Sequence, residues 1–130
     1  MLKILAENAK LITVTASVAA DLANKEGYVV EQIAASNKVQ LYTTGIPYAV
    51  LGERIQGSDQ WNAYDLRGGG IVPCVAGGAI NTPSYVKPAN GGKVVAGAQN
   101  DHCVGVKRDP VAACADGEAI GVHVGLSVMP

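Results

Sequence analysis

The chain is poor in large side chains. Its 130 residues include no phenylalanine, one tryptophan and five tyrosines, with eight leucines and eight isoleucines. The apolar content of 48% is made mostly of alanine and valine, at 19 and 17 residues. This content excludes intrinsic disorder, and the length fits one domain rather than two full-sized ones. Because the core would be thin for a solitary monomer, we expect some apolar surface to be buried against partners.

The sequence also lacks an excess of charge and a long apolar run. Ten Lys and Arg residues oppose eleven Asp and Glu residues, and neither half of the chain carries a basic stripe. Binding to a phosphate backbone requires such a stripe, so we predict neither nucleic acid nor a membrane as a partner. No segment approaches the roughly 18 uncharged apolar residues of a transmembrane helix. Residues 11–20 are closest to a signal peptide, but hydroxyl residues dilute them, and we interpret them as containing a short strand.

Cysteine and histidine are scarce. The three cysteines, Cys74, Cys103 and Cys114, occur in no CxxC or CxxH pattern, so neither a zinc site nor a disulfide framework is supported. A single disulfide pair stays open as an alternative to reduced, partly buried thiols. His102 and Cys103 are adjacent, so on a strand they would point to opposite faces. No nucleophile, zinc-protease or paired-carboxylate motif is present. We therefore predict no enzyme, no cofactor and no metal.

Two glycine-rich segments have the composition of phosphate loops without the required pattern. Residues 87–95 read KPANGGKVV, with Lys87 where the loop needs its first glycine and Val94 where it needs a hydroxyl. A hairpin turn at 90–92 is the better interpretation. Residues 67–70, RGGG, resemble an anion-binding nest, but no helix follows them to add its dipole.

Short strands separated by turn residues are what the sequence has in abundance. Strands are predicted by period-two alternation or by short apolar runs between Gly, Pro, Asn and Asp residues. They cover residues 12–15, 39–43, 48–51, 71–75, 94–96, 103–106 and 119–126. Residues 16–25 predict a short helix ending before Gly27. This punctuation is typical of a β-barrel or sandwich.

The last predicted strand has two different faces. One face carries branched residues, and the other carries only small residues and His123. A face without bulk lets another backbone approach closely, so Gly121, His123 and Gly125 are candidate subunit-interface residues, with ordinary close packing as the alternative. Trp61 is a fourth candidate, either as an interface anchor or as a core residue beneath a loop.

A weak internal repeat relates the two halves of the chain. The dipeptide at 38–39 recurs at 93–94, an offset of 55 residues, and each copy is followed by an apolar strand, a charged turn and a further strand. The pattern predicts two related β-units that together close one small barrel.

These motifs resemble a known family. Residues 85–126 contain a strand, the NGG turn, KVVAGA, HCVGV and the terminal VAACADGEAIGVHVGLS; residues 48–80 contain YAVLGE and AYDLRGGGIVPCVAGGAI. The succession is similar to that of the small decoration (cement) proteins of tailed-bacteriophage capsids, over roughly residues 30–128. The resemblance implies a mainly β, small single-domain β-barrel or β-tulip fold with short helical turns. It also implies an extended N-terminal arm over 1–27, with a short strand and possible short helix, and a compact domain over 28–130.

The same resemblance implies a function. Such proteins are made in the host cytoplasm, bind the outside of the virion head as homotrimers and brace the major capsid protein lattice. Their arm adds a strand to the lattice, so the capsid-binding residues would be Leu11, Ile12, Thr13, Val14 and Thr15. We expect this arm to be disordered in the free protein. Two alternatives are a tail or fibre component, and a small β-barrel binding protein or hydrolase that uses His102, His123 or a cysteine.

Overall fold

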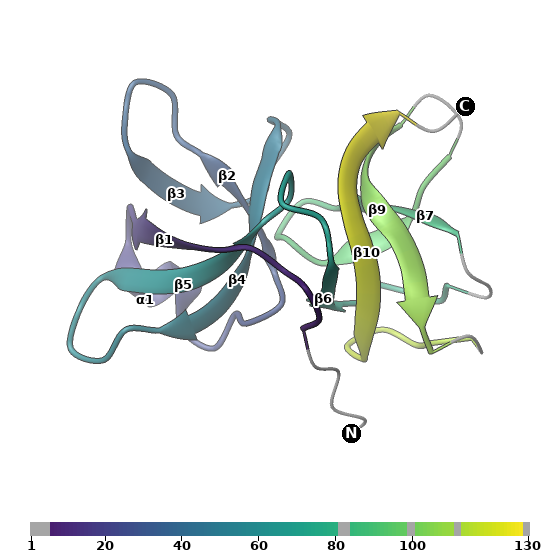
Figure 1. The fold of residues 1–130 in the computed structure, drawn as a ribbon. Coiled ribbons are helices and arrows are strands. Elements are labelled where there is room, and N and C mark those ends of the chain that lie inside the picture. Colours follow the sequence, from purple (N-terminus) through teal and green to yellow (C-terminus); the bar gives the residue numbers. More distant parts are fainter. Residues whose placement is uncertain (1–5, 81–83, 99–100, 111–112, 129–130) are drawn as a thin grey trace.

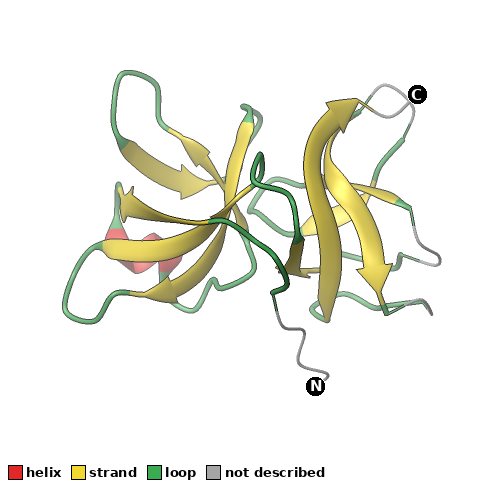
Figure 2. Ribbon diagram, viewed as in Figure 1, coloured by secondary structure: helices red, strands yellow, loops and turns green. Residues whose placement is uncertain are grey.

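The computed structural model describes residues 6–80, 84–98, 101–110 and 113–128. This part of the chain is almost entirely strands and loops (Figures 1 and 2). The elements are β1 Leu11–Ala16, α1 Ala19–Leu22, β2 Val29–Gln32, β3 Lys38–Leu41, β4 Pro47–Arg54, β5 Gln60–Asp65, β6 Ile71–Val75, β7 Tyr85–Pro88, β8 Val94–Ala96, β9 His102–Asp109 and β10 Ala119–Val128. No helix in these ranges is long and apolar enough to cross a membrane. The predicted mainly β fold with a barrel is confirmed.

Strands β1–β5 form a closed barrel, which we call the first unit. Its strand order is β1-β3-β2-β4-β5, and β1 runs antiparallel to β5 over its first five residues. The barrel closes where the end of β1 meets the start of β3 in parallel, at Thr15↔Lys38 and Ala16↔Val39. The Ser17 amide continues this contact by donating a hydrogen bond of 3.0 Å to the Val39 carbonyl. Closure therefore depends on one short parallel pair.

Strands β6–β10 form a five-stranded sheet, the second unit, in the order β6-β10-β9-β7-β8. Its four neighbouring pairs are all antiparallel. An isolated parallel bridge, Ala76↔Val94, joins the residue after β6 to the first residue of β8. The two outer strands of this sheet therefore approach each other at one point, as β1 and β3 do in the first unit.

The two units have the same topology. When β1–β5 are replaced by β6–β10 in order, every strand pair of the first unit has a counterpart in the second, including the parallel contacts Ala16↔Val39 and Ala76↔Val94. Val39 and Val94 are 55 residues apart, the offset of the weak sequence repeat. The predicted arrangement of the repeat is nonetheless wrong. The structure contains a closed barrel of β1–β5 and a separate five-stranded sheet of β6–β10, and every strand pair lies within one of the two units.

Alternation along the strands divides the apolar residues between two cores. Val30 points into the barrel, while its neighbour Val29 points out and packs with the second unit. Val50 and Leu66 of the first unit also join the second core. Strands β2 and β4 are thus covered on both faces, which explains why Val29 and Val30 of β2 and the apolar run of β4 show no alternation with polar residues. The barrel core consists of Val14, Ala16, Leu22, Val30, Val39, Ala49, Leu51, Trp61 and Ala63.

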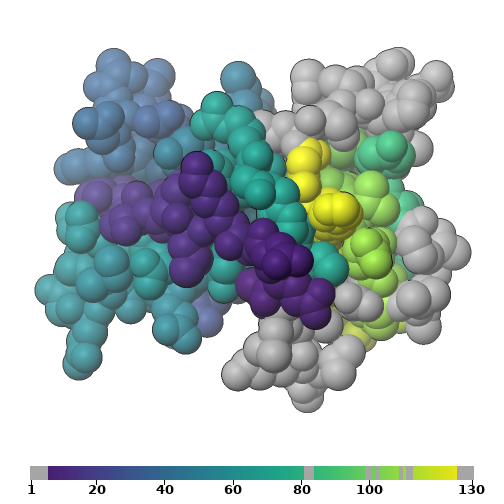
Figure 3. Space-filling view, viewed as in Figure 1, coloured from purple at the N-terminus to yellow at the C-terminus, as the bar shows by residue number. Residues whose placement is uncertain are grey.

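Backbone hydrogen bonds fasten the units to each other. The Val29 amide donates to the Gly92 carbonyl at 2.7 Å, and the Gly91 amide donates to the Tyr42 carbonyl at 2.8 Å. Gly92 has φ of +95°, and a Cβ there would lie 2.7 Å from the Val29 carbonyl oxygen. The predicted hairpin turn is confirmed as the connection between β7 and β8, and its glycine permits this close approach. In Figure 3 the N-terminal residues, in purple, extend from the first unit toward the second, where Glu7 pairs with Ile71 of β6.

Strand β1 belongs to the barrel, which corrects the arm predicted over 1–27. Val14 and Ala16 are 4% and 2% exposed in the barrel core, and β1 pairs with β5 and β3. Its apolar residues therefore find their core within their own chain, and the compact fold begins at β1 rather than at residue 28. The remainder of the predicted arm, at 1–5, lies outside the described residues.

Helix α1 is shorter than the predicted segment 16–25. It spans four residues and buries only Leu22. Asn24 and Gly27, just beyond it, have φ of +59° and +85°, values that end a right-handed helix. The first part of the predicted helix is still β-strand, because Ala16 pairs with Val39.

The close backbone approach expected beside β10 occurs inside the second unit. A Cβ on Gly105 of β9 would overlap the His123 carbonyl oxygen of β10 and lie 2.9 Å from Val122 Cγ1. The pairing of β9 with β10 shifts register on either side of this point, between Gly121 and Val122 and after Val124. Gly105 is thus required by packing, whereas a Cβ on Gly125 would meet nothing within 4 Å.

A buried carboxylate holds the loop between β3 and β4. Glu31 of β2 is 7% exposed and accepts hydrogen bonds from the Thr43 amide at 2.7 Å, the Gln40 side chain at 2.9 Å, the Thr43 hydroxyl at 3.0 Å and the Gly45 amide at 3.2 Å. Burial is the largest single effect on the pKa of Glu31 and raises it, but the four hydrogen bonds together outweigh burial and lower it. The ionised form is therefore the one that the fold stabilises.

Replacing Gly105 by alanine should destabilise the fold. The new Cβ must displace the backbone of β10, and overpacking of this kind typically costs about 1–3 kcal/mol. Gly78→Ala is the matched control, because a Cβ there meets nothing within 4 Å, and it should change the unfolding free energy by less than about 0.5 kcal/mol. Urea denaturation measures both. Equal midpoints for the two variants would contradict the proposed close approach.

Replacing Glu31 by glutamine should destabilise the protein at neutral pH by about 1–3 kcal/mol, because charge-assisted hydrogen bonds are lost. Since the pKa of Glu31 is lowered in the folded state, its stabilisation is present above the ordinary value of 4.5 and is lost as pH falls through the lower folded value. The difference between wild type and variant should therefore shrink below pH 4.5. Glu53→Gln, at an exposed position, is the control, and a pH-independent difference would refute the role of the Glu31 charge.

Candidate functional site

Trp61 is a core residue. Its side chain is 2% exposed within the barrel, and the Arg54 guanidinium covers its ring at 4.8 Å from the centroid. Arg54 is itself held by a hydrogen bond of 2.8 Å from its Nε to the Ser58 carbonyl. The alternative that placed Trp61 in the core is therefore the one observed, and Trp61 has no accessible surface to offer a second subunit.

The other predicted interface residues lie on one face of the second unit, which we call the β10 face. Gly121 is buried, whereas His123 and Gly125 are exposed. His123 lies opposite Ile71 of β6 and Val106 of β9, and directly opposed residues share a face of a sheet. Both neighbours are half-buried. The β10 face therefore presents a histidine surrounded by small and aliphatic residues.

The predicted capsid-binding residues alternate between inside and outside. Leu11 and Thr13 are exposed, at 58% for Leu11, while Ile12 and Val14 turn inward. Thr15 is half-buried at the point where β1 meets β3. Only the outward residues of β1 are therefore available to another molecule.

The cysteines are placed as core groups. Cys74, Cys103 and Cys114 are all buried, and none of them forms a disulfide within the described residues. Burial raises the pKa of Cys74 to about 12. A buried thiol with a raised pKa is neutral at physiological pH and is a poor nucleophile. Among the described residues, no group of three or more His, Cys, Asp or Glu residues could hold a metal ion.

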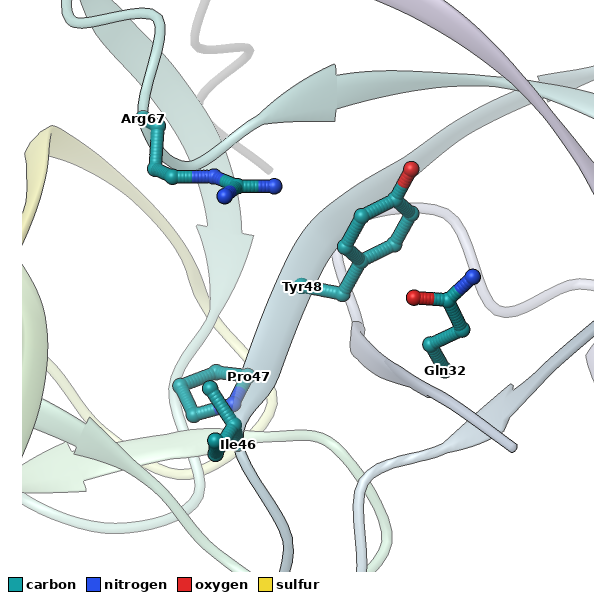
Figure 4. A pocket seen from close by; sticks show the side chains of 5 residues that line it. All are labelled: Gln32, Ile46, Pro47, Tyr48 and Arg67. Carbon is teal, nitrogen blue, oxygen red and sulfur yellow. The ribbon is translucent and has the colours of Figure 1, made fainter. Parts of the chain in front are cut away.

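A pocket of about 250 Å³ opens at the end of the barrel where β4 begins. We call it the Tyr48 pocket; its lining residues are Gln32, Ile46, Pro47, Tyr48 and Arg67. Figure 4 shows the Arg67 guanidinium extending toward the Tyr48 ring, with the Gln32 amide on the other side of the ring. Ile46 and Pro47 lie below them. The pocket thus combines an apolar base with three polar groups.

Local sequence explains how the pocket is held. Ile46 follows the loop fixed by Glu31 and is 80% exposed, and Pro47 restricts the backbone beside it. Arg67 follows β5, and its amide donates to the Asp65 carboxylate at 3.0 Å. The Arg67 side chain is 68% exposed, and its Nε lies 3.9 Å from the same carboxylate, so this ion pair leaves the side chain largely accessible.

The sequence contained part of the signal for this pocket. Residues 67–70 resemble an anion-binding nest in sequence, and Gly69 and Gly70 do have positive φ of +72° and +83°. The sequence did not predict the residues on the other side of the pocket, Ile46 and Gln32. Ile46 belongs to a turn, and nothing in the sequence pairs that turn with Gln32 of β2 or with Arg67.

Comparisons with known proteins bear on the fold. No family model matches the chain, and no curated protein matches its sequence. Among solved structures, the chain is similar to the N base of the head fiber protein gp8.5 of bacteriophage phi29. The TM-score is 0.60 at 15% sequence identity, and the match covers 93% of this chain and 98% of that one. The chain therefore shares its fold, over nearly its whole length, with the base of a bacteriophage head fiber.

Proposed function

We propose that this protein is a structural component of a bacteriophage virion that attaches to the outside of the head. In its finer form, it binds as a homotrimer and stabilises the lattice of the major capsid protein. The observation that carries the proposal is the shared fold with a head-fiber base across 93% of the chain. The sequence resemblance to decoration proteins supports the same location by a separate route.

Self-association by the β10 face would address the shortage of core-forming residues. On the β10 face Gly125 is exposed, and Ile71 and Val106 are half-buried around His123. A glycine without a side chain lets the backbone of another subunit approach closely. His123 lies at the centre of this face, so a substitution that introduces a negative charge there would disrupt the contact. We propose this face as the contact between protomers.

A binding role without catalysis fits the chemistry of the site. The three thiols are buried, and the described residues that line the Tyr48 pocket include no carboxylate, cysteine or histidine. Its side chains can donate hydrogen bonds, accept them and pack, but they offer no evident general base or nucleophile. These side chains are suited to binding the surface of another molecule.

A second function is favoured by the name of the structural neighbour. That protein is the base of a head fiber, so this chain could serve as the attachment base of a fibre instead of a lattice clamp. The two roles differ in their effect on the shell. A clamp raises the temperature at which capsids fall apart, whereas an isolated attachment base need not.

Assembly is tested by sedimentation. The purified chain should sediment with three times its mass of 13.3 kDa, and His123→Glu should shift it to the monomer because a buried unpaired carboxylate is costly. Asn62→Glu, at an exposed position of β5 in the first unit, is the control and should stay trimeric. A monomeric wild type, or a trimer that His123→Glu leaves intact, would rule out the proposed contact.

Attachment is tested with capsids stripped of their decoration. The protein should cosediment with them and, as a clamp, should raise their disruption temperature in calorimetry. Binding without any thermal effect would select the fibre-base role instead. Absence of binding to capsids from the virus that encodes the chain would overturn the head-surface proposal altogether.

A further inference from the structure

We propose that the Tyr48 pocket docks an acidic segment of a partner protein, with a carboxylate on Arg67 and a neighbouring apolar side chain on Ile46. The identification of the partner as the capsid surface rests on the proposed function. The preference of the site for an acidic segment is independent of that function. None of the residues predicted to bind the capsid or to form the subunit interface lines this pocket. The inference therefore adds a second contact region, in the first unit, to the β10 face of the second.

The polar groups of the pocket are available for a ligand. In the described part of the chain, neither the Tyr48 hydroxyl nor the Gln32 amide makes a hydrogen bond to another residue. Arg67 makes one long ion pair, 3.9 Å to Asp65, which leaves its terminal nitrogens open. Arg67 can therefore bind a carboxylate through two parallel hydrogen bonds, while Tyr48 and Gln32 bind adjacent peptide groups.

The local charge favours an anion. Among the described residues, those that line the pocket include one cation and no carboxylate. The nearby carboxylate of Glu31 is 7% exposed and already accepts four hydrogen bonds. The Asp65 carboxylate lies 3.9 Å from Arg67 Nε and its side chain is 15% exposed, so an acidic group would approach the terminal nitrogens of Arg67, which face away from this pair.

Ile46 indicates that the ligand is a protein segment. An isoleucine side chain that is 80% exposed gains free energy only when another apolar surface covers it. Arginine and tyrosine are enriched at protein interfaces. The volume of about 250 Å³ is below the roughly 300–1,000 Å³ of small-molecule sites, so it suits a side chain or two rather than a whole free ligand.

The site is also rigid enough to recognise a defined shape. Glu31 fixes the loop before Ile46 through the Thr43 and Gly45 amides. The loop after Arg67 is tied to the second unit, because the Val124 amide donates to the Gly70 carbonyl at 3.0 Å. Both sides of the pocket are therefore ordered before binding, which lowers the entropic cost of association.

A peptide titration tests the proposal on the full chain. The probes are N-acetyl-Glu-Leu-amide and its neutral analogue N-acetyl-Gln-Leu-amide, followed by amide chemical shifts in NMR. The acidic peptide should shift residues 32, 46, 48 and 67, and should bind at least about tenfold more tightly than the neutral one. Equal binding of both peptides, or shifts confined to other surfaces, would refute the site.

Variants separate charge from shape. Arg67→Gln should abolish the preference for the acidic peptide, and Ile46→Ser should weaken binding of both peptides while leaving the melting temperature unchanged, because Ile46 is exposed. Arg108→Gln, at an exposed arginine of β9, is the matched control and should behave as wild type. If methyl glucuronide shifts the same residues as strongly as the acidic peptide, the site recognises an anionic sugar and the protein-segment assignment is wrong.

A capsid-binding arm distinguishes this inference from the proposed function. If wild type binds stripped capsids and Arg67→Gln binds at least about tenfold more weakly, both are supported. If the variant binds equally well, the pocket is not the contact and the head-surface function stands. If wild type fails to bind capsids, the function fails, while the peptide titration still decides whether the pocket takes an acidic segment.

Discussion

The short parallel contact between the first and third strands of each unit is the constraint on which this fold depends. In the first unit it consists of Thr15↔Lys38 and Ala16↔Val39, and in the second of the single bridge Ala76↔Val94. Closing a sheet onto itself leaves fewer exposed edges and creates an interior that small residues can fill. A chain rich in alanine and valine can therefore build two compact units without phenylalanine.

Local sequence patterns predicted most of the strands. The remaining assignments, those of β1 and β2, depend on which strands lie next to them in the fold. Alternation at 39–43 and 119–126 predicted β3 and β10, because each has one buried and one more exposed face. Strand β2 was missed, since Val29 and Val30 are buried on opposite faces and show no alternation. The arm was misassigned for a related reason: the apolar side chains of β1 meet their partners on β5, about fifty residues along the chain.

The candidate site shows the same limit more sharply. In the sequence nothing distinguishes Glu31 from a charged surface residue, yet its carboxylate accepts hydrogen bonds from two backbone amides of a later loop. That contact in turn sets the position of Ile46 beside Arg67. A pocket assembled from β2, β4 and the loop after β5 depends on three-dimensional neighbours, so residue types alone could indicate only its glycine-rich part.

The sharing of Val29, Val50 and Leu66 with the second core has a consequence for the order of events during synthesis. The first unit has all its strands once residue 65 has left the ribosome, so its barrel can close while the rest of the chain is still being made. These three side chains then remain on its outer surface as an apolar platform. The second unit would complete its core against that platform, so the barrel would serve the C-terminal half of its own chain as a template.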